Sequence, residues 1–185
     1  RVEELSMKAE LRKKILQEMK ALSQEQKQAM DRALTERFLQ HPFYQEAKTI
    51  ATYLSFPHEF QTQELIEQAL KDGKKVLIPK TYPKGRMEFV VYDPQQLVKT
   101  SFGLLEPQGD LEVVEPSQID LIHVPGLAFT TEDYRIGYGG GYYDRYLENF
   151  AGHTMSTIYP CQIQNFNSED HDIPVQEVLI YEGNL

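Results

Sequence analysis

The succession of short apolar segments around one amphipathic segment constrains the fold of this chain more than any other feature. Residues 49–56 are rich in β-branched and aromatic side chains, which is typical of a strand. Residues 62–70 have helical character and end at Asp72-Gly73, a common helix stop, and the apolar Val-Leu-Ile run 76–78 follows. So compact an apolar run is typical of a parallel strand buried on both faces. Strand, helix and strand in this order predict a right-handed βαβ unit and therefore a parallel sheet.

Further elements extend this pattern on both sides. Two helices are expected at the front of the chain, over residues 8–22 and then from a Ser23–Gln26 capping box to residue 40. Other strands are expected at residues 87–92, 121–124, 154–159 and 178–181, and a helix at residues 141–150. The long irregular stretch 93–118 is more typical of a functional loop than of filler.

The length of 185 residues suits one domain with its own core. We therefore predict an α/β fold: a single three-layer α/β/α domain with a mainly parallel, Rossmann-like sheet, spanning residues 7–185. Residues 1–6, ahead of Met7, are expected to be an upstream remnant outside the fold.

The charge balance limits the classes of partner. Lys and Arg number 19 against 28 Asp and Glu, a net charge of −9, which argues against non-specific binding to nucleic acid or to acidic membranes. No apolar run approaches the roughly 20 residues that span a bilayer, and no leader-like segment is visible. The single Cys161 cannot pair within the chain, so a reducing compartment, the cytoplasm, is expected. We expect this cysteine to be a small buried apolar side chain rather than a nucleophile, and the protein to be a monomer.

A glycine-rich segment carries the clearest functional signal. Four of the five residues 137–141 are glycine, and Arg135, Asp144 and Arg145 flank them. Glycine lets several backbone N–H groups converge on one anion, and a helix that begins at the loop would add its positive dipole end. Neither GxGxxG nor the P-loop pattern matches, because Tyr142 stands at the third glycine position and no lysine follows. A tight structural turn is the plainer alternative, but the flanking charges favour a phosphate site.

The sequence Arg-Ile-Gly-Tyr-Gly-Gly-Gly-Tyr-Tyr-Asp-Arg, residues 135–145, resembles the signature of the 5-formyltetrahydrofolate cyclo-ligase family. The preceding segment 120–129 is similar too, and the likeness runs from Lys8 to Asp172. The resemblance implies conversion of 5-formyltetrahydrofolate to 5,10-methenyltetrahydrofolate with ATP and Mg²⁺, releasing ADP and phosphate. In that chemistry the formyl oxygen is phosphorylated, a neighbouring nitrogen attacks, and phosphate departs. Positioning and charge stabilisation carry such phosphoryl transfer.

The same resemblance assigns roles residue by residue. It implies that the residues that bind ATP are Lys8, Ala9, Glu10, Leu11, Arg12, Arg135, Ile136, Gly137, Tyr138, Gly139, Gly140, Gly141, Tyr142 and Tyr143. It implies that those that bind the reduced folate are Leu54, Glu59, Phe102, Tyr138, Gly139, Gly140, Gly141 and Tyr142. Asp144 and Asp172 match magnesium ligands, and Arg135 would be the catalytic charge nearest the transferring phosphoryl group. A transition metal at His171 is the less favoured interpretation, because only one histidine lies there.

The chain also departs from the family pattern. Some members have a lysine where this chain has Gly140, and we hypothesise that Arg145 supplies the missing catalytic charge. Thr130 and Tyr134 stand where Asp and Gly are common, which puts the local turn in doubt.

Two other classes of function stay open on the residues alone. A non-catalytic folate-binding protein would need the folate contacts but no phosphate site. A sugar-phosphate isomerase or CoA transferase could use a similar α/β frame, since fold likeness does not decide function.

Overall fold

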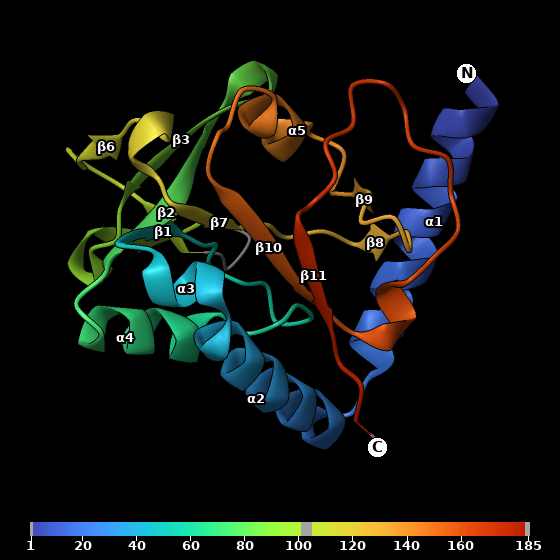
Figure 1. Ribbon diagram of the computed structural model, residues 1–185. Coiled ribbons are helices and arrows are strands. Elements are labelled where there is room, and N and C mark those ends of the chain that lie inside the picture. The colour runs from blue at the N-terminus through green and yellow to red at the C-terminus, as the bar shows by residue number, and fades with distance from the viewer. Residues whose placement is uncertain (1, 101–104, 184–185) are drawn as a thin grey trace.

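The computed structural model describes residues 2–100 and 105–183, which form one central sheet with helices on both faces (Figure 1). In spatial order the sheet contains β11 (Glu177–Ile180), β10 (His153–Ile158), β7 (Leu121–His123), β1 (Thr49–Ala51), β2 (Lys75–Tyr82), β3 (Arg86–Val91) and β6 (Val113–Val114). The strands from β11 to β2 pair in parallel, and β3 and β6 are added antiparallel at one edge. The predicted mainly parallel sheet is confirmed.

Five α-helices surround this sheet in the described part of the chain. They are α1 (Val2–Ala21), α2 (Gln24–Gln40), α3 (Pro42–Glu46), α4 (Gln63–Lys71) and α5 (Tyr142–Leu147). Figure 1 shows α2, α3 and α4 on one face of the sheet and α5 on the other. The predicted three-layer arrangement is therefore confirmed, with the second helical layer reduced to the short α5.

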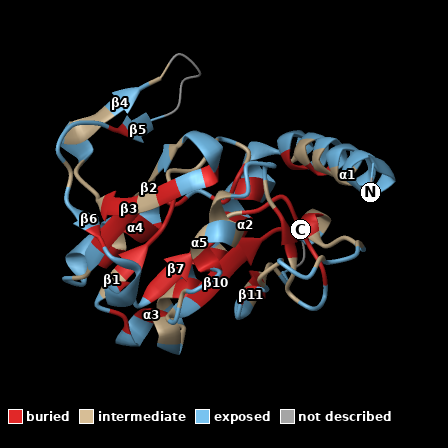
Figure 2. Ribbon diagram, turned by 90° about the horizontal axis from the view of Figure 1, so that it is seen from above, coloured by how far each residue is buried: buried red, intermediate tan, exposed pale blue. Residues whose placement is uncertain are grey.

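Alternation along the strands explains the two cores. In β1, Ile50 joins the core under α1 to α4, and its neighbour Ala51 joins the core under α5. Leu121 and Ile122 of β7 divide in the same way, as the pleat of a strand requires. All four side chains are fully buried, and Figure 2 shows the central strands as the most buried part of the molecule.

The predicted strand boundaries differ from the observed ones at the β1–β2 pair. The run 49–56 pairs only as far as Ala51, whereas β2 continues past Pro79. Leu77 faces β1, because its carbonyl accepts from Thr52, so the next odd residue, Pro79, also has its nitrogen on that side. Since β1 has ended there, the missing proline N–H removes no ladder hydrogen bond.

The remaining differences concern segments without strong periodicity. Residues 2–6, which the sequence suggested to be outside the fold, form the first turns of α1. The stretch 93–118 is not wholly irregular, because it contains the hairpin β4 (Leu97–Lys99) and β5 (Leu105–Pro107) and the edge strand β6. A second hairpin joins β8 (Ala128–Phe129) and β9 (Arg135–Ile136). Short 3₁₀ helices, each beginning with proline, lie at Pro83–Gly85, Pro94–Gln96, Pro116–Gln118 and Pro160–Gln162.

Two properties bear on the classes of function considered above. Within residues 2–100 and 105–183, no helix combines the length and the apolarity needed to cross a membrane. Cys161 is half-buried, and burial raises the pKa of its thiol to about 11. The thiol is therefore protonated near neutral pH, which fits the expected apolar side chain better than a nucleophile.

Candidate active site

The β8–β9 hairpin fixes Arg135, the predicted catalytic residue, in a buried position. Arg135 pairs with Phe129 across the hairpin, and its Nε donates to the carbonyl oxygen of Pro125 at 2.8 Å. Only 7% of the residue is exposed, and burial lowers its pKa, but a guanidinium stays protonated at neutral pH. Its Nη1 lies 3.6 Å from Oδ1 of Asp144, which makes an ion pair without a close hydrogen bond.

The turn that connects these two strands forms despite the departures from the family pattern. Thr130 accepts the backbone N–H of Tyr134 on its side-chain oxygen at 3.2 Å and donates its own backbone N–H to the Tyr134 carbonyl at 2.9 Å. Asp133 has a φ of 71°, a left-handed conformation that aspartate tolerates better than most residues. The doubt about this turn is therefore resolved by Thr130 and Asp133 together.

Glycine is required at different positions of the loop 137–141 for different steric reasons. Gly139 and Gly141 have φ values of 105° and 72°, where a side chain is strained. A Cβ on Gly137 would lie 2.4 Å from Nη2 of Arg135, so glycine is needed there for the guanidinium to pass. The loop is held from the other side by Arg12, whose Nε donates to the carbonyl oxygen of Gly137 at 2.8 Å. Two residues 125 positions apart in the sequence thus meet at one loop.

The helix after this loop is shorter than expected. The sequence predicted a helix over residues 141–150, but α5 ends at Leu147, and the N–H of Phe150 closes a turn onto the Leu147 carbonyl. Its dipole spans only six residues. Anion binding here therefore depends on the loop amides and on the nearby cations more than on a helix dipole.

A cavity of about 490 Å³ brings the separate parts of the predicted site together. The predicted site residues that line it are Lys8, Arg12, Arg135, Ile136, Gly137, Tyr138, Gly139, Gly140, Gly141, Tyr142, Tyr143, Asp144 and Asp172. The sequence analysis had considered His171 only as a less favoured transition-metal ligand, and it did not name the remaining lining residues, which are Leu5, Pro79, Thr81, Met87, Pro125 and Glu169. Of these, only Glu169 had a signal in the sequence, because it belongs to the acidic run that includes Asp172.

Acidic side chains occupy one wall of this cavity. Oδ1 of Asp144 is buried and has no hydrogen-bond partner among the described residues. Burial raises the pKa of the Asp144 carboxyl, and the charge of Asp172 adds to this, while Arg135 lowers it. Asp172 accepts the backbone N–H of Glu169 at 2.8 Å, and Glu169 also forms a 3.4 Å ion pair with Lys8. One ligand atom each from Glu169, His171 and Asp172 lie within 4.8 Å of one another.

This oxygen-rich wall fits a hard divalent cation. The buried oxygen of Asp144, which lacks a hydrogen bond among the described residues, and a second carboxylate on Asp172 are the donors that magnesium uses, usually one or two at a time with retained waters. His171 is the one nitrogen donor, and its side chain is 71% exposed. The donor set therefore favours magnesium over a transition metal.

Glu59 lies in a tight turn after β1 that reaches the glycine-rich loop. Its Oε1 accepts the backbone N–H of Phe56 at 2.8 Å, and only 4% of the residue is exposed. Burial raises the pKa of the Glu59 carboxyl to about 7, while hydrogen bonds from Phe56 and Tyr138 lower it. The neighbouring His58 contacts the hydroxyl of Tyr138 through Nε2 at 2.8 Å. The structure thus brings Glu59 close to Tyr138, and the folate contact of Glu59 stays a prediction.

Of the other predicted folate contacts, Tyr138, Gly139, Gly140, Gly141 and Tyr142 line the cavity, whereas Glu59 itself does not. Leu54 is half-buried against the core under α1 to α4 and does not line the cavity. Phe102 lies outside the residues that the structure describes.

Arg145 has a structural contact in place of the expected catalytic one. Its Nη1 donates to the carbonyl oxygen of Lys84 at 3.0 Å and contacts that of Gly140 at 3.4 Å. The guanidinium passes 1.5 Å from where a Cβ on Gly85 would lie, and Arg145 lines a neighbouring hollow rather than the cavity of Arg135. Arg145 therefore ties the loop to the turn before β3, and its part in phosphoryl transfer stays a prediction that would require the side chain to move.

Comparison with known proteins agrees with this assembly of residues. Residues 4–181 match the model of the 5-formyltetrahydrofolate cyclo-ligase family. The 5-formyltetrahydrofolate cyclo-ligase of Escherichia coli K12 is 36% identical over 173 residues, covering 89% of this chain and 95% of the relative. That of Mus musculus is 33% identical over 189 residues, covering 94% and 93%. The structure of the Aquifex aeolicus 5,10-methenyltetrahydrofolate synthetase is 31% identical with a TM-score of 0.82, covering 96% of this chain and 91% of the other. The Mycoplasma pneumoniae synthetase is 26% identical with a TM-score of 0.77, covering 93% and 97%.

Proposed function

The chain belongs to the 5-formyltetrahydrofolate cyclo-ligase family, and we propose that it performs this ring closure with ATP and magnesium as its co-substrate and metal. The enzyme class follows from relatives that are similar over most of the chain. The observation that carries the nucleotide part is the loop 137–141, held between Arg12 and Arg135 at the wall of one cavity.

Charge supports a phosphate site at this loop. Lys8, Arg12 and Arg135 all line the cavity, although the chain as a whole has a net charge of −9. These cations line the same cavity as the glycine-rich loop and the acidic wall of Asp144, Glu169 and Asp172, and the presence of both charges there supports a phosphate next to a divalent cation. Arg135 is buried and keeps its charge, so it is suited to stabilise charge that develops on a transferring phosphoryl group.

Asp144 and Asp172 would hold Mg²⁺ on the acidic wall. Bound there, the ion would neutralise charge on the triphosphate and polarise the phosphoryl group. Asp144 is suited to this task because its buried oxygen lacks a hydrogen bond and its pKa is raised by burial, both of which a cation would relieve.

A second cavity, of about 400 Å³, supports a place for the nucleoside. It shares Lys8 and Glu169 with the first cavity, so the two adjoin. Its walls combine apolar Leu11 and Phe166 with the amide side chain of Asn165. An apolar slot with a few amide groups suits a purine ring, and we propose that the nucleoside extends into it from the phosphates.

The reduced folate would bind from the opposite side of the loop. The Glu59 carboxylate would accept hydrogen bonds from the pterin amino groups, and Tyr138 would contact both substrates. With the substrates aligned, the formyl oxygen attacks the terminal phosphorus and ADP leaves. The neighbouring nitrogen, N10, then attacks the formyl carbon and loses its proton, and phosphate departs with the former formyl oxygen. The protein's contribution is alignment and charge stabilisation.

The decisive experiment is a direct assay. The purified chain is mixed with 5-formyltetrahydrofolate, ATP and Mg²⁺, and the near-ultraviolet absorbance of the methenyl product is followed. We expect product that depends on all three, with loss of activity in Arg135→Met. A non-catalytic folate-binding protein would bind without forming product, and an isomerase or CoA transferase would do neither. Either result would refute the proposal.

A further inference from the structure

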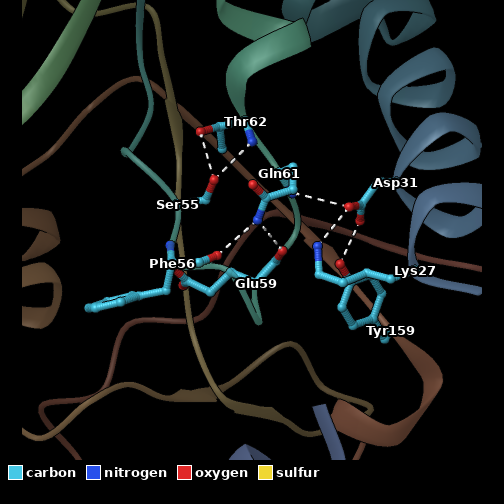
Figure 3. Close-up of polar contacts among 8 residues, drawn as sticks. All are labelled: Lys27, Asp31, Ser55, Phe56, Glu59, Gln61, Thr62 and Tyr159. Carbon is cyan, nitrogen blue, oxygen red and sulfur yellow. Dashed lines mark hydrogen bonds and ion pairs between the residues drawn. The ribbon is translucent and has the colours of Figure 1, made fainter. Parts of the chain in front are cut away.

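The turn that carries Glu59 is held by one side chain that the sequence analysis did not single out. Nε2 of Gln61 donates to the carbonyl oxygen of Phe56 at 2.8 Å and to that of Glu59 at 3.0 Å (Figure 3). These two carbonyls belong to the two ends of the turn, since the Glu59 N–H also bonds the Phe56 carbonyl at 3.1 Å. The amide of Gln61 therefore closes the turn across its open side.

Gln61 is in turn fixed by its neighbours in the structure. Its backbone N–H points to Oδ2 of Asp31 on α2 at 3.4 Å. The next residue, Thr62, donates its N–H to the Ser55 hydroxyl at 3.2 Å and its own hydroxyl to the Tyr53 carbonyl at 2.6 Å. These bonds close the segment 53–62 at its base, so the backbone that carries the Gln61 side chain has a defined position.

Asp31 belongs to a buried polar network behind the turn. Lys27 donates to Oδ2 of Asp31 at 2.8 Å, and the hydroxyl of the fully buried Tyr159 donates to its other oxygen (Figure 3). Lys27 and Asp31 are only 6% and 9% exposed. A buried ion pair is weak as a source of stability, because desolvation offsets the attraction, but it fixes geometry. The charge of Lys27 also lowers the pKa of the Glu59 carboxyl, so the network acts on Glu59 electrostatically as well.

From these contacts we propose that Gln61 is a positioning residue for the reduced-folate substrate, acting through the turn that presents Glu59. The inference rests on the proposed function, in which Glu59 contacts the pterin. The Gln61 side chain is exposed and adds little to the core, so a role in folding alone does not explain its two hydrogen bonds to the turn.

The test uses an isosteric variant. Gln61→Glu keeps the size of the side chain but has no N–H donor when ionised, and it sets a carboxylate against two carbonyl oxygens. Gln61→Ala removes the group altogether. Gln63→Glu is the matched control, because Gln63 lies two residues away on α4 and its amide donates to the exposed Glu67 at 3.1 Å rather than to the turn. The dissociation constant for 5-formyltetrahydrofolate is measured without nucleotide, and KM for ATP and kcat are measured with it.

We expect both Gln61 variants to weaken folate binding about tenfold, which corresponds to about 1.4 kcal/mol. KM for ATP should stay within about twofold, kcat at saturating folate within about threefold, and the control should behave as the parent protein. Folate affinity unchanged in both Gln61 variants would overturn the inference, as would an equal loss of folate and ATP affinity. Glu59→Gln is measured in parallel. If it too binds folate normally, the proposed role of Glu59 is wrong; if it alone loses affinity, only the inference about Gln61 is wrong.

Discussion

Glu59 should lower the stability of the protein above pH 7, and Glu59→Gln should remove that cost. The residue is 4% exposed, and burial raises the pKa of its carboxyl from 4.5 to about 7. A folded-state pKa above the unfolded value means that the folded protein holds the proton more tightly. The associated stability is complete below pH 4.5 and is lost as the pH rises through 7.

The size of the effect follows from the shift. A difference of 2.5 pKa units between 4.5 and 7 corresponds to about 3 kcal/mol lost by the parent protein at pH 8. Glutamine has nearly the same shape, its oxygen still accepts the N–H of Phe56, and it carries no charge to desolvate. The variant should therefore equal the parent near pH 4.5 and exceed it by about 3 kcal/mol at pH 8.

The assay is urea unfolding of both proteins across this pH range. Contributions from other titrating groups cancel in the difference between parent and variant, so the pH dependence of that difference reports on residue 59 alone. A difference that does not change between pH 4.5 and pH 8, or a variant less stable than the parent at pH 8, would refute the reasoning. The same variant should lose folate affinity, because the cost of burying the carboxylate serves binding rather than folding.

Three further predictions concern the loop, the metal wall and the core. Gly137→Ala should fold but lose activity by about 10²-fold, because its Cβ would lie 2.4 Å from the guanidinium of Arg135 and displace it; circular dichroism and kcat together check this. Removal of Mg²⁺ with EDTA should abolish turnover reversibly, and Asp144→Asn should raise the Mg²⁺ concentration for half-maximal activity on the order of tenfold; normal magnesium dependence in the variant would exclude Asp144 as a ligand. Leu34→Ala should lower the free energy of unfolding by about 2–5 kcal/mol, since the side chain is fully buried, and urea unfolding would contradict this if the loss were below 1 kcal/mol.

The fold was predictable where its causes are local. The capping box of Ser23 and Gln26 is present at the start of α2, and the β1–α4–β2 unit has the expected order. The predicted strand ends were wrong where the length of the neighbouring strand, rather than the local sequence, sets the end of the pairing. Nothing within the run 49–56 indicates that its pairing with β2 and β7 ends at Ala51. Pro79 is tolerated in β2 because of this ending.

The site residues also differ in whether the local sequence could identify them. Motif residues such as Arg135 and Asp144 could be named from the sequence, because their chemistry lies within one short segment. Gln61 could not, since its role comes from the shape of a turn, and the acidic run around Glu169 gave no sign of its ion pair with the distant Lys8. Arg145 shows the converse, because proximity in sequence suggested a charge in the cavity whereas the contact with Lys84 directs it elsewhere.

Two of the four buried side-chain polar groups that lack a hydrogen bond among the described residues line the cavity, whereas the hydroxyls of Thr100 and Tyr146 lie outside it. The hydroxyl of Tyr143 and Oδ1 of Asp144, adjacent in sequence, are buried without a hydrogen bond in the described part of the chain, and Glu59 is buried at a cost in free energy. Folding alone would favour apolar replacements at such positions. In the proposed function these three groups would contact the triphosphate, the divalent cation and the pterin, so binding would offset the cost of burying them. The support around them, from the hairpin under Arg135 to the amide of Gln61, is well bonded, which is what a site that works by alignment requires.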